Sequence, residues 1–172
     1  MRPSTSDQKV FELKPLSKEG IEGSVEKAEL YRLLNQPQLA ESICLDILLV
    51  EPNHQKAATI LLLALTDQFE SSSAKANQAI KIARGLGDEY SRVYYLGIIA
   101  ERRASAALKS RTPGADFDAY EWYLEAMELF EKADAISKPN NNDPILRWNT
   151  CARVIMERRL SERQTDTPSL ME

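Results

Sequence analysis

The stretch QLAESICLDILLVEPN, residues 38–53, contains the pattern that decides the fold. The small residue Ala40 is followed four positions later by Cys44 and three positions after that by Ile47, and Pro52 ends the run. This spacing places the three side chains on one face of a helix, and a proline just beyond the last turn is typical of a helix end. The stretch therefore predicts a helix with one buried, closely packed face.

The same spacing recurs twice further along the chain, each time in the second helix of a predicted helix hairpin. A recurring helix–turn–helix unit is the sequence signature of a solenoid, in which neighbouring hairpins bury their apolar faces against one another. The recurrences are Ala76-Ile80-Ala83 and Ala126-Phe130-Ala133, the second of which is followed by Pro139.

Helical periodicity runs through almost the whole chain, whereas β-strand signals are nearly absent. Asn35 can close the first helix in the left-handed conformation, and Pro113-Gly114 breaks the longest apolar pattern. Asp143 and Pro144 together form a typical helix start. We expect seven helices, at about 22–34, 37–50, 54–69, 73–85, 88–109, 116–137 and 143–163.

The composition indicates one folded domain. Of the 172 residues, 43% are hydrophobic and 28% are charged, and the net charge of −4 disfavours a nucleic-acid partner. No apolar run approaches the roughly 18–20 residues that span a bilayer, and residues 1–20 show no secretion signal. We therefore expect a cytoplasmic protein without membrane contact, in which Cys44 and Cys151 are free buried thiols.

Residues that could carry chemistry are few. His54 is the only histidine, and because no nucleophile or metal-ligand spacing lies near it, we expect a surface loop histidine. Glu121, Glu125, Glu128 and Glu131 lie at helical spacing, but without the Glu-x-x-His pairs of di-iron bundles they predict a solvated acidic face. The common catalytic and phosphate-binding motifs are missing as well. We expect no catalytic residue, no cofactor, no metal ligand and no enzymatic activity.

The repeated pattern resembles that of the tetratricopeptide repeat (TPR) family, whose unit is a pair of helices with small or bulky residues at fixed positions. Ala28 and Tyr31 match the small and aromatic positions of a first helix, and Pro52 matches the junction between two units. Leu96-Gly97 matches the family's most recognisable first-helix pair. The combination is similar to small bacterial TPR proteins.

The resemblance covers about residues 21–160, and Ser24, Lys27 and Leu62 depart from the family's preferred residues. It implies an all-α fold, a right-handed α–α superhelix of about three hairpins plus a C-terminal capping helix. We expect this domain at residues 21–163, a flexible N-terminal segment at residues 1–20 and a flexible tail at residues 164–172.

The third hairpin should be elongated. Gly97 and Ala126 lie 29 residues apart, where a regular TPR unit has about 12, so each helix gains roughly eight residues, or about 12 Å. Antiparallel pairing around the turn opposes residues whose numbers sum to about 227, such as Ala104 and Tyr123. The same pairing predicts ion pairs between the basic residues Arg102, Arg103, Lys109 and Arg111 and the acidic residues Asp116, Asp118, Glu121 and Glu125.

The resemblance also implies a function, because TPR domains bind extended or helical peptides along a groove formed by their first helices. We therefore expect a non-catalytic interaction module or adaptor that binds an unidentified protein or peptide through this groove, the protruding third hairpin, or both. For Tyr94 and Trp148, packing against the next helix is an equal alternative. The groove candidates are Glu29, Arg32, Lys56, Thr59, Leu63, Tyr94, Ile98, Glu101 and Trp148.

Two other functions stay open. A structural protein could form homo-oligomers through the aromatic residues of the third hairpin, Phe117, Tyr120, Trp122 and Tyr123. A weaker alternative is a nucleic-acid accessory role through the arginines of the last helix, although Glu157 and Glu162 interrupt them. These arginines are Arg147, Arg153, Arg158, Arg159 and Arg163.

Overall fold

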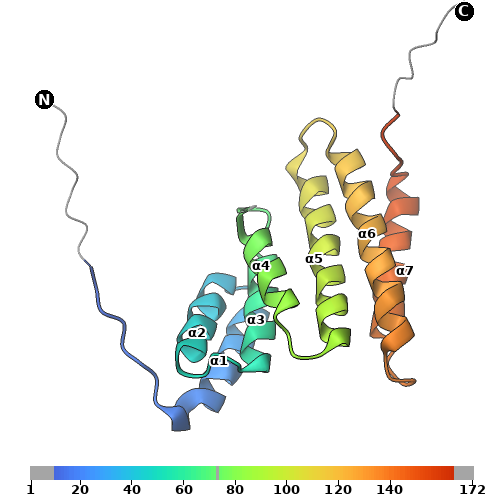
Figure 1. Cartoon of the computed structure of the whole chain (residues 1–172). Coiled ribbons are helices and arrows are strands. Elements are labelled where there is room, and N and C mark those ends of the chain that lie inside the picture. Colours follow the sequence, from blue (N-terminus) through green and yellow to red (C-terminus); the bar gives the residue numbers. More distant parts are fainter. Residues whose placement is uncertain (1–9, 73, 165–172) are drawn as a thin grey trace, which may run out of the picture.

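The computed structural model describes residues 10–72 and 74–164, and in these ranges it contains helices and no strand (Figure 1). The all-α class is therefore confirmed. A short 3-10 helix, η1 (Lys18–Gly20), precedes the seven α-helices of the described residues. These are α1 (Ile21–Leu33), α2 (Pro37–Val50), α3 (Gln55–Thr66), α4 (Ala74–Arg84), α5 (Glu89–Ser110), α6 (Ala115–Ile136) and α7 (Asp143–Arg158).

The helix ends follow from local capping. Asn35 takes the left-handed conformation, with φ of 58°, and Pro37 is the first residue of α2, both as predicted. His54 lies at the predicted junction, but its Nδ1 accepts a hydrogen bond from the Ala57 amide at 3.1 Å and so caps α3. The last helix is shorter than expected, because Arg159 adopts a left-handed φ of 54° and stops α7 at Arg158.

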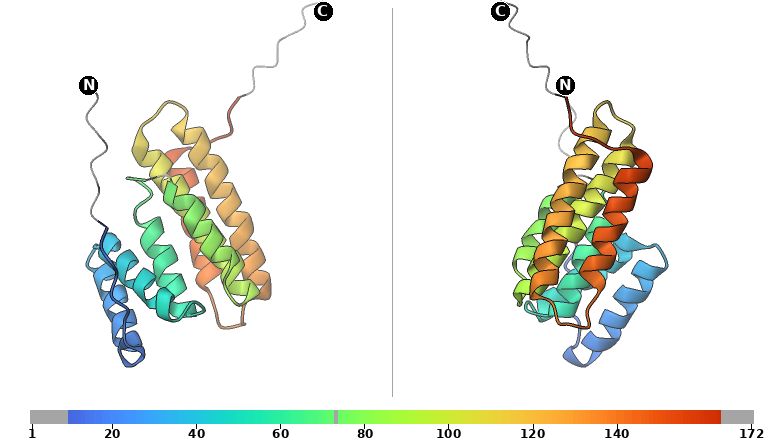
Figure 2. Two further views of the ribbon diagram at one scale, coloured as in Figure 1. Left: turned by 60° about the vertical axis from the view of Figure 1, so that its left-hand side comes forward. Right: turned by 90° about the vertical axis from the view of Figure 1, so that its right-hand side faces the viewer.

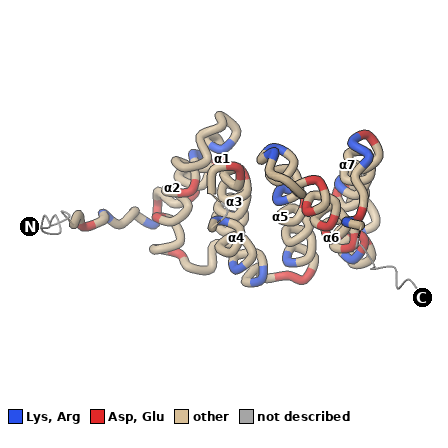
Figure 3. The backbone as a smooth tube through the Cα atoms, turned by 90° about the horizontal axis from the view of Figure 1, so that it is seen from above, with Lys and Arg blue, Asp and Glu red and all other residues tan. Residues whose placement is uncertain are grey.

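The helices are arranged in a row in which each helix contacts the one before it and the one after it. Contacts that skip a helix include those of α1 with α3 and of α3 with α5. Figure 3 shows the row from above, from α1 and α2 at one end to α6 and α7 at the other. None of the described helices is both long and apolar enough to cross a bilayer.

The third hairpin is elongated, as the sequence predicts. Helices α5 and α6 have 22 residues each, whereas α3 has 12 and α4 has 11. Figure 2 shows the long hairpin from two sides, with α7 alongside it. A left-handed Gly114, with φ of 82°, begins α6 after the turn.

The register of the long hairpin is confirmed by one close contact. A Cβ atom added to Gly97 would lie 2.7 Å from Cε1 of Phe130, and these residue numbers sum to 227. The expected ion pairs within the hairpin were wrong for two residues. Arg102 lies 3.9 Å from Asp67, and Lys109 pairs with Glu70, because both basic side chains turn toward the end of α3.

Two hydrophobic clusters hold the row together. The first joins α1 to α4 with one side of α5, and the second joins the rest of α5 with α6 and α7. Leu63 and Tyr95 pack against both clusters and so connect them. Leu16 is the part of the N-terminal segment that packs against the first cluster.

The two ends of the chain were expected to be flexible. Most of that expectation concerns residues 1–9 and 165–172, which lie outside the described residues. Within residues 10–17 the backbone forms no helix, and Val10, Phe11 and Leu13 are exposed.

We predict that Gly97→Ala destabilises the protein by about 1–3 kcal/mol, since the added methyl group overlaps the fully buried ring of Phe130. The matched control is Gly23→Ala, also inside a helix, where the added Cβ meets nothing within 4 Å. The control should gain about 0.5–1 kcal/mol from helix propensity. Urea unfolding measures both changes, and equal effects at the two glycines would contradict the register.

Candidate partner-binding face

Ion pairs link α1 to α3 at two points. Glu29 Oε2 lies 3.1 Å from Lys56 Nζ, and Arg32 Nε lies 2.7 Å from Asp67 Oδ2. The first pair is solvent-exposed, whereas the second is mostly shielded. Since Arg102 of α5 also approaches Asp67, this carboxylate joins α1, the end of α3 and α5.

A further ion pair links α5 to α7. Arg147 Nη1 lies 3.2 Å from Glu101 Oε1, and the Glu101 residue is only 9% exposed. Burial raises the pKa of the Glu101 carboxyl, and the charges of Arg147 and Arg102 oppose that rise. The neighbouring Arg147 also opposes the rise that burial causes in the pKa of the Tyr94 phenol.

A polar pocket of about 390 Å³ opens between α1, α3 and α5. Its charged lining consists of three basic and two acidic side chains, with Ser105 and Thr66 between them. Such a lining can accept acidic and basic groups of a partner at neighbouring points. The charged residues are Arg32, Arg102, Lys109, Asp67 and Glu70.

A second pocket, of about 650 Å³, lies between the start of α5 and the segment that joins α6 to α7. Three tyrosines line it. The rings of Tyr90 and Tyr94 stack with centroids 5.5 Å apart, and Tyr95 meets Tyr94 edge-on at 5.3 Å. Asn141 donates a hydrogen bond of 2.7 Å to the hydroxyl of Tyr90. Burial raises the pKa of all three phenols, so they stay neutral near pH 7.

Most of the predicted groove residues form one surface. Thr59 and Leu63 are half-buried on α3, and Leu63 packs against the cluster that contains Tyr94 and Tyr95. Helices α1, α3 and α5 contribute side by side, because α3 contacts both of the others. We call this surface the odd-helix face and define it by Glu29, Arg32, Lys56, Thr59, Leu63, Asp67, Tyr94 and Arg102.

Three predicted groove residues are not part of this face. Ile98 is 1% exposed and belongs to the core between α5 and α6, so its side chain has no surface for a partner. Trp148 packs against α6 and donates from Nε1 to Glu131 at 2.9 Å. Glu101 is also largely covered, and its structural contact is with Arg147.

Asp67 and Arg102 belong to this face but are not among the residues that the sequence pattern predicts. Asp67 lies just after the last residue of α3, outside the predicted groove positions. Arg102 was expected to form an ion pair with an acidic residue of α6, but it approaches Asp67 instead. A signal was present, since Arg102 follows Tyr94, Ile98 and Glu101 at helical spacing along α5.

The chemistry open to the described residues is limited. Burial raises the pKa of the Cys44 and Cys151 thiols to about 12, so neither is a nucleophilic thiolate at neutral pH. Within residues 10–72 and 74–164, no group of three or more His, Cys, Asp or Glu side chains is placed to hold a metal ion.

Comparison of the chain with family models, with curated proteins and with solved structures finds no match.

We predict a distinctive pH dependence for the buried Glu101. Its folded-state pKa lies above the ordinary value, so the folded protein holds this proton more tightly than the unfolded chain. The stability that this group contributes is present in acid and is lost as the pH rises through the raised pKa. The unfolding free energy of the wild type minus that of Glu101→Gln should therefore fall as the pH rises above the ordinary pKa of a glutamate, about 4.3.

Urea unfolding at a series of pH values tests the prediction. In Arg147→Met the trend should become steeper, because the guanidinium that lowers the Glu101 pKa is removed. A wild-type minus Glu101→Gln difference that is constant or rises with pH would contradict a buried, proton-retaining carboxyl.

Proposed function

We propose that the protein is a helical-repeat module of the TPR type that binds a protein or peptide partner without catalysis. Its three hairpins and the last helix would then form a right-handed superhelix, with α7 as the cap. Two observations support this arrangement. The small residues of the repeated triplets, such as Ala40, Ala83 and Ala126, are fully buried, and α3 contacts both α1 and α5.

The observation that carries the proposal is the composition of the odd-helix face. Residues of three successive odd-numbered helices form cross-helix ion pairs there, and Leu63, Tyr94 and Tyr95 are half-buried against the same hydrophobic cluster. Exposed ion pairs such as Glu29–Lys56 contribute under about 1 kcal/mol, so a partner's charges can replace them at little cost. Half-buried aromatic and aliphatic groups supply the apolar contact that such replacement needs.

The pocket between α1, α3 and α5 suggests which charges a partner segment would carry. Its charges of both signs, which include Arg32, Asp67 and Arg102, fit an extended segment that carries both acidic and basic residues. We infer a cytoplasmic location, because two buried, unpaired cysteines fit a reducing compartment.

Self-association through the aromatic hairpin is the second candidate, and the structure gives it less surface than the sequence suggested. Tyr123 is buried, and the guanidinium of Arg103 covers the ring of Trp122 at 3.5 Å. Fewer arginines are available to bind a nucleic acid than the sequence suggested, since Arg147 pairs with Glu101 and Arg163 pairs with Asp118.

The experiment is a selection of binding peptides from a displayed random library, followed by calorimetric titration of the selected peptides. Ser105→Trp places a large ring in the polar pocket of the odd-helix face and should weaken binding about tenfold or more. The matched control is Gln78→Trp, an exposed position of α4 that lines a pocket between α2, α3 and α4.

The control should bind within about threefold of the wild type, since single surface changes outside an interface are close to neutral. Peptides that respond to Gln78→Trp and ignore Ser105→Trp would contradict the proposed face. A library that yields no binding peptide would count against the peptide-binding function itself.

A further inference from the structure

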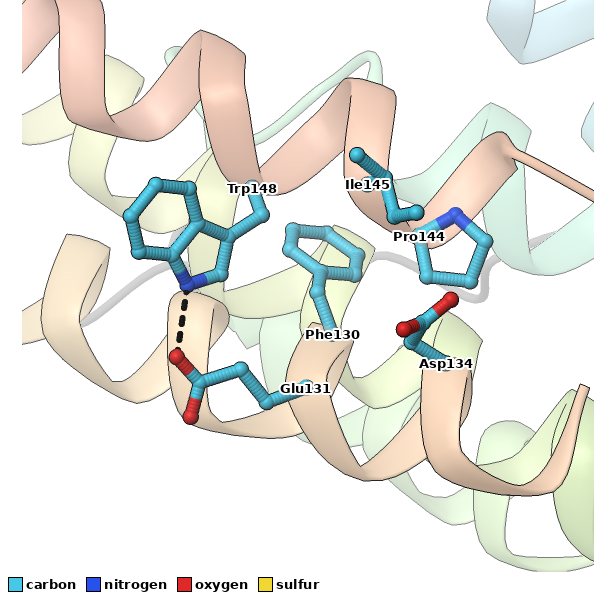
Figure 4. Close-up of a pocket in the computed structure, with 6 residues that line it drawn as sticks. All are labelled: Phe130, Glu131, Asp134, Pro144, Ile145 and Trp148. Atoms are coloured by element: carbon cyan, nitrogen blue, oxygen red, sulfur yellow. Dashed lines mark hydrogen bonds between the residues drawn. The ribbon is translucent and has the colours of Figure 1, made fainter.

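A separate small pocket lies between α6 and α7, at the end of the row of helices. Its volume is about 190 Å³, and Figure 4 shows the six residues that line it. Phe130, Glu131 and Asp134 come from α6, and Pro144, Ile145 and Trp148 come from α7. None of the residues that define the odd-helix face lines this pocket.

The pocket has an apolar floor and an acidic rim. In Figure 4 the ring of Phe130 lies between the two helices, with the indole of Trp148 on one side and Pro144 on the other. The carboxylates of Glu131 and Asp134 flank this ring. One oxygen of Glu131 accepts the Trp148 Nε1 hydrogen at 2.9 Å, which fixes both side chains and leaves the second oxygen for another donor.

The charge around the pocket is strongly negative. Helix α6 contains seven carboxylates and one lysine, all exposed, whereas the remainder of the chain has a net charge of +2. The nearest cation of α7 is Arg147, which is already paired with Glu101. This field attracts a positively charged group and repels polyanions, including nucleic acids.

The size of the pocket restricts its occupant to a single side chain. Pockets for whole small molecules are about 300–1,000 Å³, so this one is too small for such a ligand. A long basic side chain suits it, since the methylene stem can lie on the exposed Ile145 while the charged head reaches the rim. Beyond the rim, Leu146 is 61% exposed and offers contact to apolar neighbours of that side chain.

We propose that this pocket binds one arginine side chain of a protein segment in which the arginine is flanked by apolar residues. A planar guanidinium can stack on the Trp148 indole and donate to the carboxylates of Glu131 and Asp134 at the same time. A lysine ammonium is a point charge and cannot do both equally well. The site shares no residue with the odd-helix face and therefore stands or fails independently of the proposed function.

The test uses two synthetic peptides, acetyl-Ala-Leu-Arg-Leu-Ala-amide and the same peptide with citrulline in place of arginine. Citrulline keeps the shape of arginine but lacks its charge. Calorimetry measures affinity, and the emission of Trp148 in a Trp122→Phe background reports occupation of the pocket, because these are the only two tryptophans. The arginine peptide should bind at least about tenfold more tightly than the citrulline peptide and change the Trp148 emission.

Two double variants separate the pocket from the general field of α6. In Glu131→Gln/Asp134→Asn the rim loses its charges, while the glutamine oxygen can still accept the Trp148 hydrogen, so affinity should fall about tenfold or more. Glu121→Gln/Glu125→Gln removes the same charge from exposed positions of α6 outside the pocket and should change affinity less than about threefold.

Equal losses in the two double variants, equal binding of both peptides, or unchanged Trp148 emission would overturn the proposal. Sedimentation equilibrium examines the other occupant, a second copy of this chain. Wild-type association that disappears in Glu131→Gln/Asp134→Asn would overturn the assignment to a foreign segment, and a monomer in both samples agrees with it.

Discussion

The contact between Gly97 and Phe130 is the constraint on which the second half of the structure depends. Because position 97 has no side chain, α5 and α6 approach closely enough to bury the Phe130 ring completely. This contact fixes the register of the two longest helices, and the same ring packs near Tyr94 with centroids 5.9 Å apart. Phe130 also forms part of the pocket between α6 and α7. One small residue therefore positions a tyrosine of the odd-helix face and the floor of the end pocket.

Polar contacts place the remaining elements relative to one another. The apolar clusters hold each helix against its neighbours. Where odd-numbered helices meet, at Asp67 and at Glu101, the side chains form ion pairs. A buried carboxylate such as Glu101 is costly without its partner, so Arg147 restricts where α7 can lie. The exposed pairs on the odd-helix face, such as Glu29–Lys56, cost far less to separate.

Sequence pattern was sufficient for the elements and for the register of the long hairpin. Periodicity, Asn35, Pro37 and the Pro113-Gly114 break located helices whose ends agree with the structure within a few residues. The pattern could not show which neighbour covers a given face. Arg102 and Lys109 were expected to form ion pairs with acidic residues of α6, the next helix in the sequence. Their carboxylate partners instead lie at the end of α3 and just beyond it. For the same reason Ile98 was placed on a groove although it is buried in the cluster formed by α5, α6 and α7, and the cap formed by His54 has no common sequence signal.

The proposed docking of a partner on the odd-numbered helices can be tested at the level of single residues. The most direct measurement is a backbone-amide NMR titration of the labelled protein with a library-selected peptide, read residue by residue. The account predicts shifts confined to α1, α3 and α5, around Arg32, Thr59 and Tyr94, with the amides of α2 and α4 nearly unchanged. Shifts concentrated on α2 and α4, or spread evenly over the chain, would contradict it.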